Sequence, residues 1–212
     1  MDAPAIVLLG PPASGKGTQG RLLAREEDLS YFSTGKQLRR EMKAASPLGK
    51  EVEPYLAAGQ YVPDELVLAL AIGWIRKVKG GWVLDGFPRT LPQAEELDRV
   101  LGVDGARLRA LLLEGPVAEL ERRVTDRREC TACPWTGTRV QAELSGGVCP
   151  TCGATLGQRH DDDLENFRQR LKAFEELTLP VASYYEQSGR LLRVWGVGSP
   201  EEVFQNVQSE LA

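Results

Sequence analysis

The stretch that most constrains this chain runs from Gly10 to Thr18 and reads GPPASGKGT, which has the glycine and lysine spacing of a phosphate-binding loop. It follows the apolar run Ala5–Leu9 and precedes a segment compatible with a helix. In this context backbone N–H groups can wrap an anion, the helix N-terminus adds a favourable dipole, and Lys16 supplies a positive charge for the outer phosphates. Gly17 directly follows the lysine, so the hydroxyl comes one residue late, at Thr18. An ordinary strand-to-helix turn rich in small residues is the alternative, and the flanking segments disfavour it.

The composition is typical of a globular domain with one core. The chain has 212 residues, of which 42% are hydrophobic and 26% charged, enough for a substantial core and an inserted subdomain. A formal net charge of −4 gives no general attraction to nucleic acid or an anionic membrane. No apolar run approaches the ~20 residues of a membrane span, and the N-terminal residues lack the basic region of a signal peptide. We therefore expect a cytoplasmic protein with neither a nucleic acid nor a membrane as partner. We also expect it to be a monomer.

Five short apolar runs alternate with helix-compatible segments. The predicted strands are 5–9, 31–33, 82–85, 108–113 and 191–195. The predicted helices follow the glycine loop and then occupy 34–44 (capped by Thr34), 46–59, 63–77, 92–101, 116–125, 163–187 and 200–211. Strands that alternate with helices in this way predict an α/β fold with a parallel sheet and right-handed crossovers.

Residues 127–160 differ from the rest, because they contain all four cysteines and few large apolar side chains. Cys130 and Cys133 form one C-x-x-C pair, and Cys149 and Cys152 form a second. This spacing is that of a zinc site, and four thiolates suit a closed, tetrahedral, structural site. Two disulfides are the alternative, which a cytoplasmic location disfavours, and a redox C-x-x-C is disfavoured because there are two pairs. His160 is not needed as a fifth ligand and is expected at the edge of this segment.

Asp85 ends the predicted third strand, at the edge where open α/β sheets bind their ligands. A carboxylate at that place can hold Mg²⁺, directly or through water, beside the phosphates. A strand-terminal aspartate is weak evidence alone, but it is stronger next to a phosphate-binding loop.

The stretch from Asp85 to Ala94 reads DGFPRTLPQA, and together with the glycine loop it resembles the nucleoside monophosphate kinases, specifically the adenylate kinase family. The sequence STG at Ser33–Gly35, followed by Leu38 and Arg39, resembles the monophosphate-site motif of that family, and GQYVPDELV at Gly59–Val67 resembles its next segment. The resemblance runs nearly end to end. It implies reversible phosphoryl transfer, MgATP + AMP = 2 ADP, which requires Mg²⁺ and has ATP, AMP and ADP as ligands.

The same resemblance implies a P-loop NTPase-type parallel five-stranded sheet flanked by helices, with a nucleoside-monophosphate-binding insertion and a zinc-binding lid. The implied core comprises residues 1–126 and 161–212, with an AMP-binding subdomain at 33–62 and the lid at 127–160.

The resemblance also assigns site residues. Those implied in catalysis are Lys16, Arg89, Arg123, Arg127, Arg159 and Arg170. Those implied in ATP binding are Ala13, Ser14, Gly15, Lys16, Gly17, Thr18, Arg123, Arg127, Thr136, Gly137 and Gly198. Those implied in AMP binding are Thr34, Arg39, Gln60, Tyr61, Val62, Gly86, Phe87, Pro88, Arg89, Gln93, Arg159 and Arg170. Asp85 is the magnesium residue, and Cys130, Cys133, Cys149 and Cys152 are the zinc ligands.

The chemistry of the reaction also favours arginine at these positions. Phosphoryl transfer brings many negative charges together, and a guanidinium is planar, always charged and able to bind bidentately. The alternative for each arginine is a solvated surface charge. Asp161 and Asp162 are expected to orient arginines, and a solvated acidic run over 161–163 is the alternative.

Two positions depart from the family pattern. Lys36 stands where the family usually has an aspartate that arranges water around magnesium, which leaves more of that task to Asp85. The lid also lacks, in the usual register, the aromatic residue that stacks on the ATP adenine and the Asn-Pro-Pro turn after it. Trp135 is the candidate substitute for this aromatic contact.

Two other functions compete with this interpretation. A kinase for another nucleoside monophosphate is one, although Thr34 and Gln93 favour adenine. A zinc-ribbon ATPase that binds nucleic acid is the other. It would need a basic face and a second acidic motif at a strand end, and the net charge and the short chain disfavour it.

Overall fold

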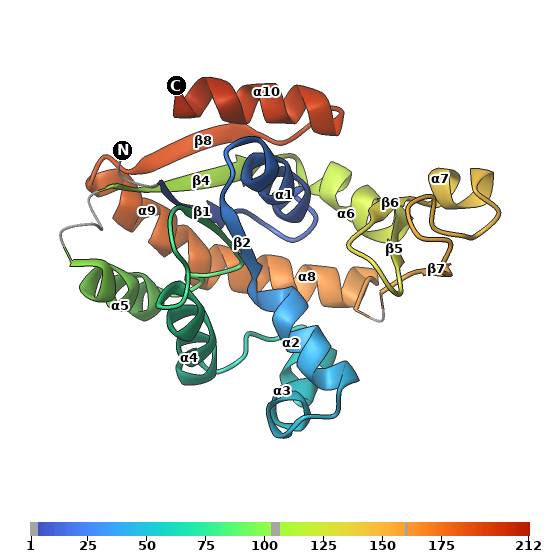
Figure 1. Cartoon of the computed structure of the whole chain (residues 1–212), viewed down its shortest axis with the longest axis horizontal. Coiled ribbons are helices and arrows are strands. Elements are labelled where there is room, and N and C mark those ends of the chain that lie inside the picture. The colour runs from blue at the N-terminus through green and yellow to red at the C-terminus, as the bar shows by residue number, and fades with distance from the viewer. Residues whose placement is uncertain (1–3, 103–106, 160) are drawn as a thin grey trace.

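The computed structural model describes residues 4–102, 107–159 and 161–212, so His160, expected at the lid edge, lies outside the described residues. Its centre is a five-stranded sheet with the order β2-β3-β1-β4-β8, in which every pairing is parallel. The strands are β1 (Ala5–Leu9), β2 (Ser30–Ser33), β3 (Trp82–Asp85), β4 (Leu108–Glu114) and β8 (Leu191–Trp195). The predicted α/β class and parallel five-stranded sheet are confirmed (Figure 1).

Burial explains why the central strands are continuous apolar runs. All five residues of β1 are buried, because helices cover both faces of the sheet. Val7 and Leu9 belong to the larger core, whereas Ile6 and Leu8 pack with residues of α1 (Lys16–Glu26) and α10 (Pro200–Leu211). The two helices lie together on one side of the sheet in Figure 1.

The opposite face is covered by α4 (Asp64–Ile75), α5 (Leu91–Leu101) and α9 (Leu179–Gln187). Two further helices, α2 (Thr34–Lys43) and α3 (Pro47–Ala57), pack on each other beyond the end of β2. After β4 the chain runs through α6 (Val117–Asp126) to the cysteine-rich segment. None of the helices in the described part is long and apolar enough to cross a membrane.

Two expectations about helices need correction. The helix predicted over 163–187 is α8 (Leu164–Ala173), a π-helical turn (Phe174–Thr178) and α9. Pro180 has no N–H to continue the α-helical ladder, which accounts for the wider turn before it. Thr34 does not cap α2 from outside: it is the first helical residue, and its side chain is buried.

The cysteine-rich segment forms a small antiparallel sheet with the order β6-β5-β7. Its strands are β5 (Arg127–Cys130), β6 (Thr136–Thr138) and β7 (Leu156–Gly157), and α7 (Arg139–Leu144) begins at a capping box made by Thr138. Figure 1 shows this unit at the side of the molecule, beyond α6. Of its described residues only Ala142 and Cys149 are buried and apolar, so hydrophobic packing contributes little to its stability.

Candidate functional site

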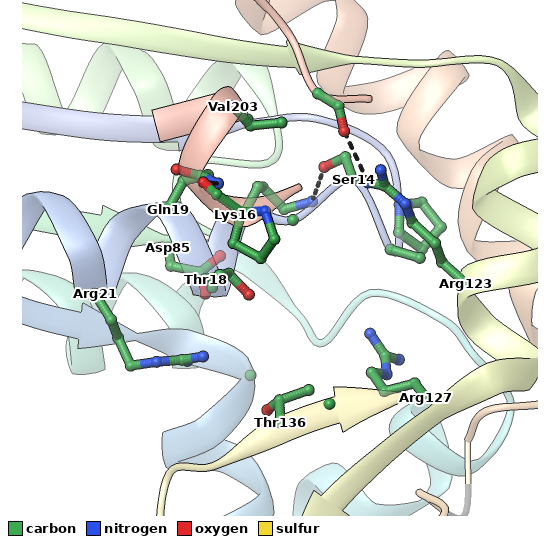
Figure 2. A pocket seen from close by; sticks show the side chains of 18 of the residues that line it. Ser14, Lys16, Thr18, Gln19, Arg21, Asp85, Arg123, Arg127, Thr136 and Val203 are labelled. Atoms are coloured by element: carbon green, nitrogen blue, oxygen red, sulfur yellow. Dashed lines mark hydrogen bonds between the residues drawn. The ribbon is translucent and has the colours of Figure 1, made fainter. Parts of the chain in front are cut away.

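A cleft of about 440 Å³ opens at the carboxyl edge of the parallel sheet. The glycine loop, α2, the end of β3, α6 and the small sheet all contribute to its walls (Figure 2). Eight arginines line it: Arg21, Arg39, Arg89, Arg122, Arg123, Arg127, Arg159 and Arg170. Such a concentration of guanidinium groups around a helix N-terminus suits a ligand with several phosphates.

The glycine loop adopts backbone angles that glycine tolerates best. Gly10 has φ 146° and Gly15 has φ 97°, in the range that L side chains rarely adopt. A Cβ at Gly10 would also come within 2.7 Å of the carbonyl oxygen of Leu113. The loop therefore depends on glycine at position 10, and it brings its backbone close to β4.

Lys16 folds back over this loop. Its ammonium donates hydrogen bonds to the carbonyl oxygens of Gly10 at 2.6 Å and Pro11 at 2.7 Å, and to Oγ of Ser14 at 3.3 Å. Burial lowers the pKa of Lys16 from its ordinary value of 10.5 to about 7, with Asp85 opposing the shift and nearby arginines adding to it. An anion in the cleft would restore the positive charge of Lys16.

Asp85 lies at the end of β3 beside the loop, where Oδ2 accepts a hydrogen bond from the hydroxyl of Tyr31 at 2.7 Å. Burial and the Asp85 carboxylate raise the pKa of Tyr31, so this hydroxyl stays a donor. A Cβ at Gly17 would come within 3.3 Å of Oδ2 of Asp85 and 3.4 Å of a guanidinium nitrogen of Arg21. The glycine after Lys16 thus allows both charged groups to approach the start of α1.

Four of the predicted arginines are paired with carboxylates, and the first of these pairs joins Arg123 to Glu119 at 2.8 Å. Arg127 binds Asp162, Arg159 binds Glu129, and Nη1 of Arg170 donates to Asp161 at 3.0 Å. Asp161 and Asp162 therefore contact arginines rather than forming a solvated run. Asp163 has a separate role, because it caps α8 by accepting the N–H of Asn166 at 2.8 Å.

The positive charges of the cleft act strongly on one another. Burial would raise the pKa of Glu129, but the hydrogen bond from Arg159 and the charges of Arg159, Arg39 and Arg127 lower it to about 2. Burial, reinforced by neighbouring arginines, lowers the pKa of Arg170 to about 10. The cluster is therefore short of negative charge, which is the condition for binding a polyanion.

Two further cations reach the cleft from α2. Arg39 and Lys36 line it, and neither forms a hydrogen bond or an ion pair with another residue in the described part of the chain. Burial and the charge of Arg21 lower the pKa of Lys36 to about 8, against the opposing charges of Glu129 and Asp85. Both side chains are available to a ligand.

A second, smaller cavity of about 30 Å³ lies beside the cleft, between α2, α3 and the start of α4. Thr34, Gln60, Tyr61, Val62 and Gln93 line it, as do three arginines that it shares with the cleft: Arg39, Arg89 and Arg170. The hydroxyl of Thr34 is buried and has no hydrogen-bond partner. A buried polar atom without a partner costs stability, and here it faces a cavity that a ligand could fill.

Arg89 is held from several sides. Its Nε donates to the carbonyl oxygen of Gly86 at 2.8 Å, and its guanidinium lies 4.8 Å from the ring centre of Tyr61. Its own carbonyl accepts from the hydroxyl of Thr178 at 2.8 Å. Because that uses the single O–H of Thr178, the hydroxyl of Tyr61 is the donor in their 3.0 Å hydrogen bond.

Some predicted residues do not line either cavity. Gly86, Phe87 and Pro88 lie behind Arg89 and are buried, so they shape its backbone. Trp135 is also absent from the walls, and a Cβ at Gly137 would come within 2.5 Å of its ring. The small sheet instead lines the cleft with Thr136, Gly137 and Thr138, and α7 adds Gln141.

The structure adds residues that sequence reasoning did not select: Tyr31, Asp64, Glu129 and Arg21. Asp64 accepts hydrogen bonds from Thr90 at 2.6 Å and from Gln93 at 2.7 Å. No local motif singles these residues out, since Tyr31, Asp64 and Glu129 each act through a partner distant in the sequence. The only signal for any of them was that Asp64 lies within Gly59–Val67, the segment that resembles the one after the family's monophosphate-site motif.

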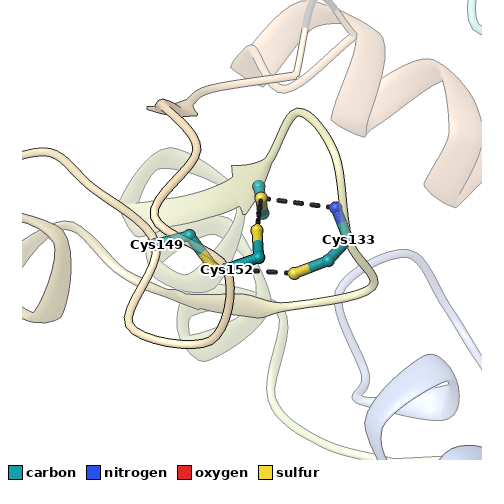
Figure 3. A group of neighbouring side chains, drawn as sticks. Cys133, Cys149 and Cys152 are labelled. Carbon is teal, nitrogen blue, oxygen red and sulfur yellow. Dashed lines mark hydrogen bonds between the residues drawn. The ribbon is translucent and has the colours of Figure 1, made fainter.

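The four cysteines converge in the small sheet and its turns (Figure 3). Their sulfur atoms all lie within 4.8 Å of one another, and all four are free thiols. The N–H groups of Ala132 and Cys133 point at Sγ of Cys130, at 3.3 Å and 3.4 Å. The hydrogen bond from Ala132 lowers the pKa of the Cys130 thiol, which favours a thiolate. This donor set could hold a metal ion.

A family model and several curated proteins match this chain, and all of them belong to the same family. The sequence model of a family described as "Adenylate kinase" matches residues 8–190. The adenylate kinase of Carboxydothermus hydrogenoformans is 39% identical over 210 residues, which cover 97% of this chain and 98% of that protein. The adenylate kinase of Syntrophobacter fumaroxidans is 40% identical over 211 residues, covering 97% and 99%, and that of Methanothrix thermoacetophila is 37% identical over 210 residues, covering 98% of each.

Proposed function

The chain belongs to the adenylate kinase family and transfers a phosphoryl group reversibly between ATP and AMP, and we propose that its two cavities divide the two nucleotides between them. The observation that carries this proposal is the shared wall: Arg39, Arg89 and Arg170 line both cavities. The transferred phosphoryl group would lie where these arginines meet.

The donor nucleotide, in this proposal, occupies the larger cleft. The backbone N–H groups of residues 13–18 cradle its phosphates, and Lys16 turns from the carbonyl oxygens of Gly10 and Pro11 to the outer phosphates. Gly198, at the far end of the cleft, and Thr136 and Gly137 on the small sheet, border its adenosine. The lid contact is then made by small residues instead of by Trp135.

The acceptor nucleotide occupies the smaller cavity with its phosphate towards the shared arginines. Arg39 and Arg89 bind this phosphate, and Thr34, the backbone at Val62 and Gln93 frame the adenine. The unpartnered hydroxyl of Thr34 supports this placement, because adenine nitrogen atoms can satisfy it. In the volume seen here the cavity is small, so binding requires α2 and α3 to move outwards.

Transfer needs no covalent intermediate. An oxygen of the AMP phosphate forms a bond to the γ-phosphorus of ATP, and the bond from that phosphorus to the bridging oxygen breaks, which leaves ADP on both sides. Charge spreads over the equatorial oxygens during this step. Arg123, Arg127, Arg159 and Arg170 would stabilise this charge, oriented by Glu119, Asp162, Glu129 and Asp161 respectively. The small sheet covers the cleft, so we propose that it acts as a lid that excludes water.

Adenylate kinases use Mg²⁺ with ATP, and Asp85 is the residue that would hold it here. The ion would neutralise phosphate charge and orient the nucleotide. Lys36, unpartnered in the same cleft, would bind phosphate oxygens and replace part of that positive charge.

The four cysteines fit zinc, since a full set of thiolates suits its closed tetrahedral site. We propose that zinc stabilises a lid comprising residues 127–160, attached to a core of 1–126 and 161–212. Free thiols at these positions suit a reducing cytoplasm. We propose that the enzyme acts as a monomer, since the residues proposed to bind both nucleotides and the metal ions all belong to one chain.

Family membership answers the two competing interpretations, since the compared relatives are adenylate kinases rather than nucleic-acid-dependent ATPases or kinases of other nucleoside monophosphates. The direct test supplies ADP alone and measures ATP and AMP. A panel of acceptors with ATP then tests the base assignment: AMP should be strongly preferred, and the donor base should matter less. Equal efficiency with UMP, CMP or GMP would contradict the roles of Thr34 and Gln93.

A further inference from the structure

Asp64 begins α4 directly behind the base end of the smaller cavity. Its Oδ1 accepts a hydrogen bond from Nε2 of Gln93 at 2.7 Å, and its Oδ2 accepts one from the hydroxyl of Thr90 at 2.6 Å. Gln93 is only 2% exposed, so its amide depends on protein partners and on whatever fills the cavity. Asp64 itself is not a wall residue of the cavity.

The partners of Gln93 determine which end of its amide is oxygen and which is nitrogen. The main-chain N–H of Arg89 can only donate, and it donates to Oε1 at 2.8 Å. An ionised carboxylate can only accept, and that of Asp64 accepts from Nε2. Turning the amide by 180° would set its NH₂ against an N–H and its oxygen against a carboxylate. One orientation is therefore strongly favoured.

We propose that Asp64 is a positioning residue that locks the Gln93 amide in the orientation matching a 6-aminopurine, and thereby makes the acceptor site reject 6-oxopurines. The inference rests on the proposed function, in which Gln93 contacts the base of AMP. After its contacts with Asp64 and Arg89, the amide keeps one N–H and one oxygen lone pair for the base.

These two groups have opposite fits to the two classes of purine. Adenine has a 6-amino donor next to the N1 acceptor, so it pairs with an amide oxygen and an amide N–H side by side. A 6-oxopurine has an acceptor oxygen next to an N1–H donor, which is the reverse. A freely turning glutamine would serve either base equally well. The main-chain N–H of Arg89 and the carboxylate of Asp64 together remove that freedom, and Asp64 supplies the charge-assisted hydrogen bond that the turned amide would lose.

The test compares AMP with inosine monophosphate, which carries oxygen in place of the 6-amino group and has no 2-amino group. In Asp64→Leu, which has a similar shape but no acceptor, the ratio of kcat/KM for AMP to that for inosine monophosphate should fall on the order of tenfold to a hundredfold, as expected for a lost hydrogen bond to a charged group. Asp64→Asn should keep the ratio within about threefold, because its oxygen can accept from Gln93 and its NH₂ can donate to Thr90.

Glu65→Leu is the matched control, since it removes the neighbouring acidic side chain of the same helix turn, which is exposed. Its ratio should equal that of the unmodified enzyme. Thermal unfolding and calorimetric affinities for both acceptors show whether the variants are folded and bind; Asp64→Ala replaces the leucine variant if the latter does not fold.

Equal losses for both acceptors in Asp64→Leu, with the ratio unchanged, would overturn the inference and leave Asp64 a structural residue. Gln93→Leu separates this failure from that of the proposed function. If Gln93→Leu leaves the ratio unchanged, the assignment of Gln93 to the base is wrong. If Gln93→Leu changes the ratio and Asp64→Leu does not, only the lock is wrong.

Discussion

The hydroxyl of Tyr31, from the first half of β2, donates a hydrogen bond to Oδ2 of Asp85 at 2.7 Å and so links β2 to the carboxyl end of β3. The carboxylate proposed to hold magnesium is therefore not free to rotate. Partners of this kind orient metal ligands and commonly change metal affinity by about 10–100-fold when removed. Tyr31 thus joins the proposed magnesium site without touching the nucleotide.

Tyr31→Phe should raise the Mg²⁺ concentration needed for half-maximal rate by about tenfold, because the Asp85 carboxylate loses its fixed orientation. The fold should persist, since the ring remains in place. The measurement is a Mg²⁺ titration at fixed ATP and AMP. Tyr184→Phe is the control: it removes a 2.7 Å hydrogen bond to Asp98, a carboxylate that does not line either cavity. A similar shift in both variants would show that Asp85 orientation is not involved.

Lys36→Asp should lower the Mg²⁺ concentration for half-saturation by about threefold to tenfold, because it places a second carboxylate near Asp85 to arrange water around the ion. The same change should weaken binding of metal-free ADP, since it removes a cation with no protein partner from the cleft. Lys50→Asp, on the exposed side of α3, makes the same charge change outside the cleft. If neither the half-saturation nor the maximal rate moves in Lys36→Asp, position 36 has no role in the metal's water shell.

Lys16→Met should lower kcat on the order of 10²–10³-fold, the usual cost of losing one preorganised group that stabilises transition-state charge. The fold should survive, because the ammonium bonds only to its own loop. Activity is measured in the direction of ADP formation, with circular dichroism to verify folding. Near-normal activity in a folded variant would remove Lys16 from the machinery.

Lys16 also predicts a pH effect. Burial lowers its pKa to about 7 in the empty cleft, so at pH 8 most of the protein carries a neutral Lys16. Phosphate oxygens favour the charged form of Lys16. Binding of ADP at pH 8 should therefore be coupled to the uptake of at most about one proton per protein molecule. Calorimetry in two buffers of different ionisation enthalpy measures this uptake, which should fall in Lys16→Met. Lys16 also affects the pH dependence of folding in the ligand-free protein. Between pH 7 and 10.5 the unfolded chain binds more protons at this group than the folded chain does, so the free energy of unfolding rises with pH in that window.

Local patterns were sufficient to predict the sheet, because each central strand is a buried apolar run and each crossover is a helix. They were insufficient where the deciding partner is remote. Asp64 and Gln93 are 29 residues apart, and Glu129 and Arg159 are 30 apart, yet these pairs orient the site. The π-helical turn before Pro180 was missed for a different reason, since the apolar side of the helix continues through it and masks the missing N–H. Trp135 was chosen by residue type, whereas its ring packs against Gly137, a wall residue, and does not itself line the cleft.

The cysteine cluster leads to the last prediction, that zinc holds the lid together but takes no part in the transfer. Within the described residues of 127–160, buried apolar side chains are limited to Ala142 and Cys149, so another interaction must offset the entropy of ordering this segment. Thiolate-rich zinc sites supply roughly 10–16 kcal/mol in small peptide systems. Four cysteine ligands fill the coordination sphere, which leaves no position for water or phosphate.

Replacing Cys130 and Cys133 with serine should therefore abolish stoichiometric zinc and lower the thermal stability of the lid, while the parallel sheet still folds because its strands lie outside 127–160. Activity should persist at low temperature and fail first on heating, since Arg127 and Arg159 stand at the base of the loosened unit. Elemental analysis of the unmodified protein comes first, followed by melting and activity curves for both proteins. Thr151→Ser is the control, because it introduces serine at an exposed position of the same segment that is not a cysteine. It should leave the zinc content, the melting curve and the activity curve unchanged. If the unmodified protein contains no metal and melts at the same temperature as the double variant, the zinc assignment is wrong. If the double variant is inactive at every temperature although its core is folded, the role of zinc is not purely structural.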